Sequence, residues 1–147
     1  MRESNFKYSV AIRTVGKAGD KYIQELQSLH NQTVKPEHIY VHLAHGFERP
    51  KEQVGMEEYI DTPKGLVHQR AAANMVEEEY VLIIDDDVYF PEDAVEKMYN
   101  ALQEYGADGI APDTFPTQDM SFLSKLGAYM TNTVKGRRND GWAIRIQ

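Results

Sequence analysis

Three adjacent aspartates, Asp85, Asp86 and Asp87, directly follow the apolar run of residues 80–84. Unpaired carboxylates repel one another and are costly to bury, so this cluster calls for a counter-charge. A hard cation such as Mg²⁺ or Mn²⁺ would supply it, because such ions prefer oxygen ligands and complete their coordination with water and substrate phosphates. The spacing therefore favours a metal-bridged phosphate or diphosphate site. The alternative is a solvated acidic turn leading into a helix, whose first turn favours negative charge.

The composition narrows the class of protein. The 147-residue chain has a net charge of −7, which argues against a general nucleic-acid binder. It contains no cysteine, which excludes disulfides and thiolate metal sites and fits a reducing compartment. The N-terminus does not resemble a signal peptide, and no apolar run approaches the ~20 residues that span a bilayer. We therefore expect a soluble, cytoplasmic protein with at most peripheral membrane contact.

Strand-like and helix-like segments alternate along the chain. Pro91 suits a first helical turn, because its missing N–H would be unpaired there, and Gly106 suits the C-terminal cap of the same helix. The alternation predicts an α/β fold with a mostly parallel sheet and helices on both faces. Strands are expected over residues 8–13, 37–43, 56–60, 80–84, 108–111 and 142–146, and helices over 17–30, 66–76 and 91–105.

The C-terminal part of the chain is basic, unlike the rest. Residues 119–130 have the spacing of an amphipathic helix, and Lys135, Arg137 and Arg138 follow it. Such a helix could lie on an anionic membrane surface. The alternative is a helix packed on the sheet and followed by a solvated basic loop.

Four short motifs occur in the order in which a known family carries them. The first strand ends in "IRT" at residues 12–14, "SLHNQTVKPEHIYVH" spans 28–42, "GLVHQR" spans 65–70, and "IDDD" at 84–87 is followed by Pro91. They resemble the "IPT", "SLxxQT", "GxxxxRN" and "LDxD…P" motifs of family-2 glycosyltransferases with the Rossmann-like GT-A fold. The resemblance spans residues 7–112, the nucleotide-sugar-binding half of that fold.

The resemblance implies roles for individual residues. Asp85 would contact the donor nucleotide near its ribose, and Asp87 would bind Mn²⁺ or Mg²⁺, which bridges the diphosphate. Asp86 would be a further donor-site residue or an alternative ligand, because three consecutive aspartates allow the motif to shift by one. Thr14 would lie where the family holds the nucleobase, although a threonine there also suits a turn cap. Arg70 would lie near the donor, the alternative being a surface arginine on a helix.

The implied activity is metal-dependent, inverting transfer of a sugar from a nucleotide-diphosphate sugar to an acceptor hydroxyl on a carbohydrate, lipid-linked molecule or protein. Two departures leave the nucleotide unspecified: Arg13 stands where the family has proline, and residues 43–46 read "LAHG" where members often have "DDGS". A signalling receiver domain is disfavoured because the first strand, "IRTVGK", ends without paired acids.

No segment after Phe115 matches the family's base-bearing motif, so the catalytic base is unknown. We expect one domain over residues 1–147, with 113–147 forming the start of an acceptor-side region and the domain truncated within it. The alternative is a non-catalytic nucleotide or nucleotide-sugar binding module.

Overall fold

The chain forms a six-stranded sheet with helices on both faces. The computed structural model of the protein describes residues 6–51, 53–110 and 142–145. The strand order is β3-β2-β1-β4-β6-β5; β1 to β4 run parallel to one another, and β6 is antiparallel to both of its neighbours. The predicted α/β fold with a mostly parallel sheet is therefore confirmed. In chain order the elements are β1 (Tyr8–Thr14), α1 (Asp20–His30), β2 (Ile39–Ala44), β3 (Glu57–Thr62), α2 (Leu66–Ala71), the 3₁₀ helix η1 (Ala72–Met75), β4 (Tyr80–Asp85), α3 (Ala94–Tyr105), β5 (Gly109–Ile110) and β6 (Trp142–Arg145).

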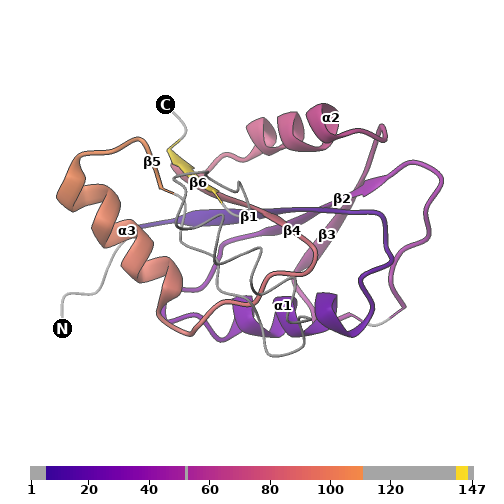
Figure 1. The fold of residues 1–147 in the computed structure, drawn as a ribbon, viewed down its shortest axis with the longest axis horizontal. Helices are drawn as coiled ribbons and strands as arrows, with labels where there is room; N and C mark the ends of the chain where they lie inside the picture. The colour runs from indigo at the N-terminus through magenta and orange to yellow at the C-terminus, as the bar shows by residue number, and fades with distance from the viewer. Residues whose placement is uncertain (1–5, 52, 111–141, 146–147) are drawn as a thin grey trace, which may run out of the picture.

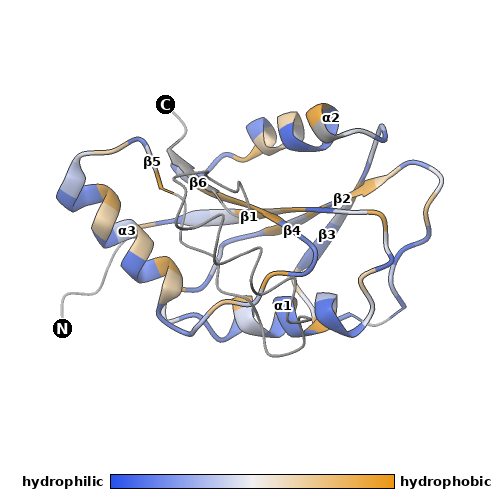
Figure 2. Cartoon of the chain, viewed as in Figure 1, coloured by the Kyte–Doolittle hydropathy of each residue, from blue (hydrophilic) through white to orange (hydrophobic). Residues whose placement is uncertain are grey.

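The two faces of the sheet are covered unequally. Helices α1 and α3 lie on one face and α2 lies on the other (Figure 1). Along α1 and α3 apolar residues alternate with polar ones, as expected for helices that cover a core with one side only (Figure 2). The larger core cluster fills the space under α1 and α3, and the smaller one, under α2 and η1, consists of Ala11, Ala73, Val76 and Val81. The larger cluster combines alternate residues of β1, β2 and β4 with Tyr22, Leu26, Leu29, Val95, Met98 and Leu102 of the helices.

Two helices start later than the sequence pattern predicts. Helix α1 begins at Asp20 rather than at residue 17, because Gly16 and Gly19 both have positive φ. Gly16 is required there: a Cβ on it would lie 2.5 Å from the Glu48 carbonyl oxygen. Helix α3 begins at Ala94, whose N–H donates to the Pro91 carbonyl at 3.0 Å in a preceding turn.

The other boundaries are close to the predictions. The helix expected over 66–76 divides into α2 and the 3₁₀ helix η1. Gly106 caps α3 in the left-handed conformation, as predicted. The expected helix at 119–130 and the basic residues after it lie outside the described residues. Within the described part of the chain, no helix is long and apolar enough to cross a membrane.

Candidate functional site

The carboxyl ends of β1, β2 and β4 meet at one edge of the sheet. In the register of the sheet, Arg13 of β1 lies between His42 of β2 and Asp85 of β4. Ligands of open α/β sheets bind at this edge. The parallel register therefore brings the three aspartates beside the end of β1, although about 70 residues separate the two segments in the chain.

Arg13 forms a bidentate ion pair with Asp85. Its Nη2 donates to Asp85 Oδ2 at 2.7 Å, and its Nε donates to Oδ1. Both side chains are partly buried, with exposed fractions of 20% and 31%. A fork-to-fork pair of this kind neutralises one carboxylate of the cluster and fixes its orientation. The sequence identified Arg13 only as a departure from the family pattern, and this pairing was not predicted.

Thr14 joins the end of β1 to the second aspartate. Its hydroxyl donates to Asp86 Oδ2 and accepts the Gly16 N–H at 2.8 Å. Thr14 is thus a turn cap and also a direct partner of the acidic cluster. Burial raises the pKa of Asp86, the Thr14 hydrogen bond opposes this shift, and the negative charges of Asp87 and Asp85 add to it.

Asp87 differs from its two neighbours. Its side chain is exposed, and none of the described residues forms a hydrogen bond or ion pair with its carboxylate. Across residues 6–51, 53–110 and 142–145, no group of three or more His, Cys, Asp or Glu side chains is arranged to hold a metal. A Mg²⁺-type ion needs only one or two protein carboxylates when phosphate and water complete its shell. Asp87, with Asp86 beside it, fits that smaller requirement.

Helix α2 is tied to the same edge by Gln69 rather than by Arg70. The buried Gln69 side chain donates to the carbonyl oxygens of Thr14 at 3.2 Å and His42 at 3.0 Å. It satisfies backbone acceptors where β1 and β2 end. Arg70 is half-buried, and no hydrogen bond or ion pair connects it with the aspartates among the described residues.

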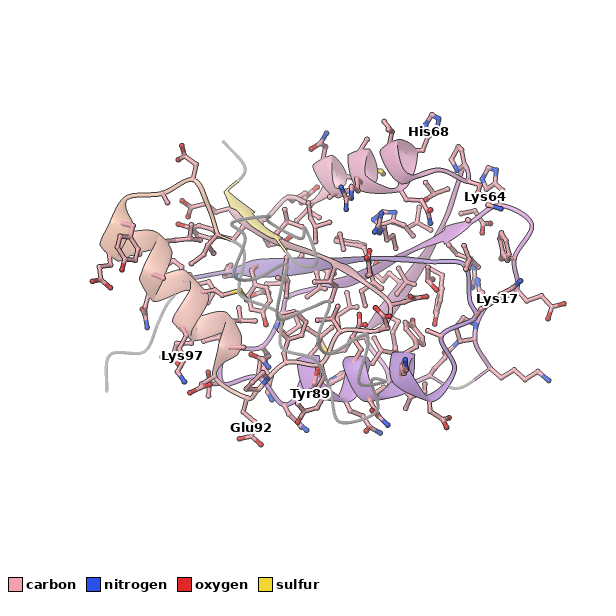
Figure 3. All side chains as sticks on the ribbon, viewed as in Figure 1. Lys17, Lys64, His68, Tyr89, Glu92 and Lys97 are labelled. Atoms are coloured by element: carbon pink, nitrogen blue, oxygen red, sulfur yellow. The ribbon has the colours of Figure 1, made fainter. Side chains whose placement is uncertain are left out.

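Positive charge surrounds Phe47 at this end of the molecule. The ammonium groups of Lys17 and Lys64 lie 5.4 Å and 5.3 Å from the centre of its ring. Lys17 follows β1, Lys64 comes just before α2, and His68 lies within α2 at the same end of the molecule (Figure 3). These lysines add to the positive charge of Arg13 at the end of the molecule where the three aspartates lie.

Glu25 of α1 lies buried against residues 85–88, the acidic loop, which comprises the three aspartates and Val88. Burial raises the pKa of its carboxyl group well above the usual value, the hydrogen bond from the Val88 N–H opposes this, and the negative charges of Asp86, Asp87 and Asp85 raise it further. The sequence analysis did not single it out, although its position between Tyr22 and Leu26 on the apolar side of α1 was a signal that it is buried.

Comparisons of sequence and of fold with known proteins agree with each other. A sequence model of the family described as "Glycosyl transferase family 2" matches residues 59–147, more than half of the chain. No curated protein matches the chain by sequence. The chain is similar in fold to crystal structures of S. aureus TarS 1-349: the complex with UDP has 15% identity and a TM-score of 0.52, and the complex with UDP-GlcNAc has 16% and 0.54.

Each of these similarities covers 76% of this chain but only 40% and 39% of the TarS chains. This chain therefore spans about two fifths of the length of the structures that it matches. The shared fold is the GT-A fold expected from the motifs. The proposed division at residue 112 stays a prediction.

Proposed function

The chain belongs to glycosyl transferase family 2, and from this premise we propose that it binds a nucleotide-diphosphate sugar with a divalent cation and transfers the sugar, with inversion, to an acceptor hydroxyl. The acceptor would be a carbohydrate, a lipid-linked molecule or a protein. The family match and the GT-A fold support the reaction class. The cation, the stereochemistry and the acceptor belong to the proposal.

The observation that carries the proposal is the position of Asp87. It is an exposed carboxylate without a partner in the described residues, and it lies next to the carboxyl end of the central strand β4. Asp85 is neutralised by Arg13 and Asp86 is hydrogen-bonded to Thr14, so Asp87 is the carboxylate left for an external cation. A bound Mn²⁺ or Mg²⁺ would offset the charge that develops on the leaving diphosphate.

The remaining site residues take roles that their surroundings allow. Asp85 would accept hydrogen bonds from the nucleotide ribose, because a carboxylate bound by one arginine keeps free acceptor positions. Thr14 would lie against the nucleobase, and Asp86 would be the alternative cation ligand. Arg70 would pair with the donor phosphates, since its guanidinium is not engaged by the aspartates.

Uridine is the first nucleotide to test. The related TarS structures were determined with UDP and with UDP-GlcNAc. The 147-residue protein would be melted with Mn²⁺ alone and with Mn²⁺ plus UDP, GDP or CDP. A ligand at one hundred times its Kd stabilises the native state by about 2.7 kcal/mol, which for a chain of this size raises Tm by roughly 5–10 °C. No shift with any nucleotide would refute the donor-site assignment.

The Asp87→Ala variant tests the metal role. We expect it to lose the Mn²⁺-dependent shift while keeping the Tm of the free protein, because the side chain is exposed and makes no contact that stabilises the described fold. The matched control is Asp93→Ala, which removes an acid six residues further on whose partner is Lys97, at 2.7 Å. It should keep the shift. Retained binding in Asp87→Ala would transfer the metal role to Asp86.

Turnover separates an enzyme from a binding module. The protein would be incubated with Mn²⁺ and radiolabelled UDP-sugars, with and without hydroxyl acceptors, and release of UDP would be measured. Metal-dependent release supports the transferase. Tight binding without release, under all acceptors tried, would favour the alternative of a non-catalytic nucleotide-sugar binding module.

A further inference from the structure

One side of helix α1 carries buried polar side chains at helical spacing. Glu25, Ser28 and Gln32, the last just beyond the helix, are 0%, 3% and 1% exposed. Positions i, i+3 and i+7 lie along one stripe of a helix, which would usually be apolar on the side that faces the core. Buried polar groups need hydrogen-bond partners, so their partners indicate what this row of residues does.

All three side chains bind the backbone that follows the aspartates. Glu25 Oε2 accepts the Val88 N–H at 2.8 Å, and Ser28 Oγ accepts the Phe90 N–H at 3.2 Å. Gln32 donates to the Pro91 carbonyl at 2.7 Å and accepts the Val95 N–H at 3.1 Å. The segment from β4 to α3 is therefore held along α1, and Figure 3 shows its residues Tyr89 and Glu92 on that side of the molecule.

Glu25 is more costly to bury than Ser28 or Gln32. Its Oε1 is fully buried and has no hydrogen-bond partner within the described part of the chain. Its carboxyl also lies close enough to the three aspartates for their charges to act on it. An apolar residue would avoid both penalties, since replacing buried ionisable groups by apolar ones is often neutral or stabilising. Its single hydrogen bond in this loop goes to Val88, the residue directly after Asp87.

We propose that Glu25 is a positioning residue for the acidic loop: by holding the Val88 N–H, it keeps Asp87 in the orientation that binds the metal–nucleotide. This inference rests on the proposed function. Ser28 and Gln32 hold the chain further on, near the start of α3, and Gln32 is treated as structural.

The first test is amide hydrogen exchange of the wild-type protein without any ligand. The Val88 amide should exchange at least tenfold more slowly than the amides of Asp87 and Tyr89, because its hydrogen bond is directed into the buried side of the loop. In Glu25→Leu this protection should be lost, and in Glu25→Gln it should return, because the glutamine side-chain oxygen can accept the same N–H. Equal exchange at the three amides of the wild type would overturn the proposal without any variant.

The second test is the affinity for Mn²⁺–UDP, measured by calorimetry on the same proteins. We expect Glu25→Leu to weaken binding about tenfold, the effect of one lost hydrogen bond, without lowering Tm. Glu25→Gln should restore the affinity. The matched control, Gln32→Leu, removes a buried amide from the same side of α1 and should lower Tm while leaving the affinity of the folded protein unchanged.

The outcomes distinguish the two proposals. Wild-type protein that binds no metal–nucleotide would refute the proposed function. Wild-type protein that binds, together with a Glu25→Leu variant that binds equally well, would refute the positioning role alone. A loss of affinity in Gln32→Leu equal to that in Glu25→Leu would also refute it, because any loosening of the loop would then have the same effect.

Discussion

Strands β1 and β4 are neighbours along their whole length, yet their two ends are built differently. At the amino end, Tyr8 pairs with Tyr80 in the sheet register, and Phe6 stacks on Tyr99 with ring centres 4.0 Å apart. Phe6 also meets Tyr80 edge to face at 6.2 Å. This end is an aromatic cluster in which large apolar surfaces are in contact.

At the carboxyl end, the same two strands bring charges together. Arg13 pairs with Asp85 in the register and by side chain, Thr14 binds Asp86, and Asp87 stays exposed. Burial and the negative charges of Asp87 and Asp85 raise the pKa of Asp86, so the polar groups at this end are held in place at an electrostatic cost. We therefore expect substitutions at the aromatic end to act mainly on stability, and substitutions at the carboxyl end to act on the proposed ligand binding.

The largest expected effect is at the aromatic end. Tyr80→Ala should destabilise the protein by about 3–5 kcal/mol, because it removes a buried ring and leaves a cavity. Urea unfolding measures this change. The affinity of the remaining folded protein for Mn²⁺–UDP should not change. Tyr80→Phe is the control: it keeps the ring and loses only the hydroxyl, which accepts from Gln103 at 3.2 Å, at a cost of about 1 kcal/mol. A large loss of affinity in Tyr80→Ala would contradict the separation of the two ends.

A smaller effect on stability is expected at the polar end. Arg13→Ala should cost about 1–3 kcal/mol, because it leaves the carboxylate of Asp85 without its partner beside two other acids. It should also weaken Mn²⁺–UDP binding. In an Asp85→Asn background the same change should cost less, and the double-mutant cycle gives the coupling. Additive costs would mean that the pair contributes nothing to either property.

The sequence predicted those parts of the site that depend on local pattern. An apolar run followed by acids predicted β4 and the aspartates at its end, and Gly106 predicted the C-terminal end of α3. The Arg13–Asp85 pair was not predictable, because it depends on the register between strands 72 residues apart. Glu25 was passed over although its spacing from Tyr22 and Leu29 places it on the apolar side of α1, because a glutamate is usually assigned to the solvent-exposed surface.

The smallest effect is expected for an exposed ion pair, His38 with Glu58, which lies at the amino end of the sheet but outside the aromatic cluster. The hydrogen bond with Glu58, at 2.7 Å, raises the pKa of His38, weak burial opposes it, and the charges of Glu58 and Glu78 add to it. A raised folded-state pKa stabilises the protein below the usual pKa of histidine, and the contribution is lost as the pH rises through the folded-state value. Because both side chains are about half exposed, solvent screens the pair, and Glu58→Gln should cost less than about 1 kcal/mol. Urea unfolding should show this cost at pH 5.5 and none at pH 8.5. The matched control is Asp61→Asn, which removes an exposed acid at the other end of β3, away from His38. An effect of Glu58→Gln as large as that of Arg13→Ala would mean that the charges at the two ends are equivalent, because a pair exposed to solvent would then contribute as much as one held within the site.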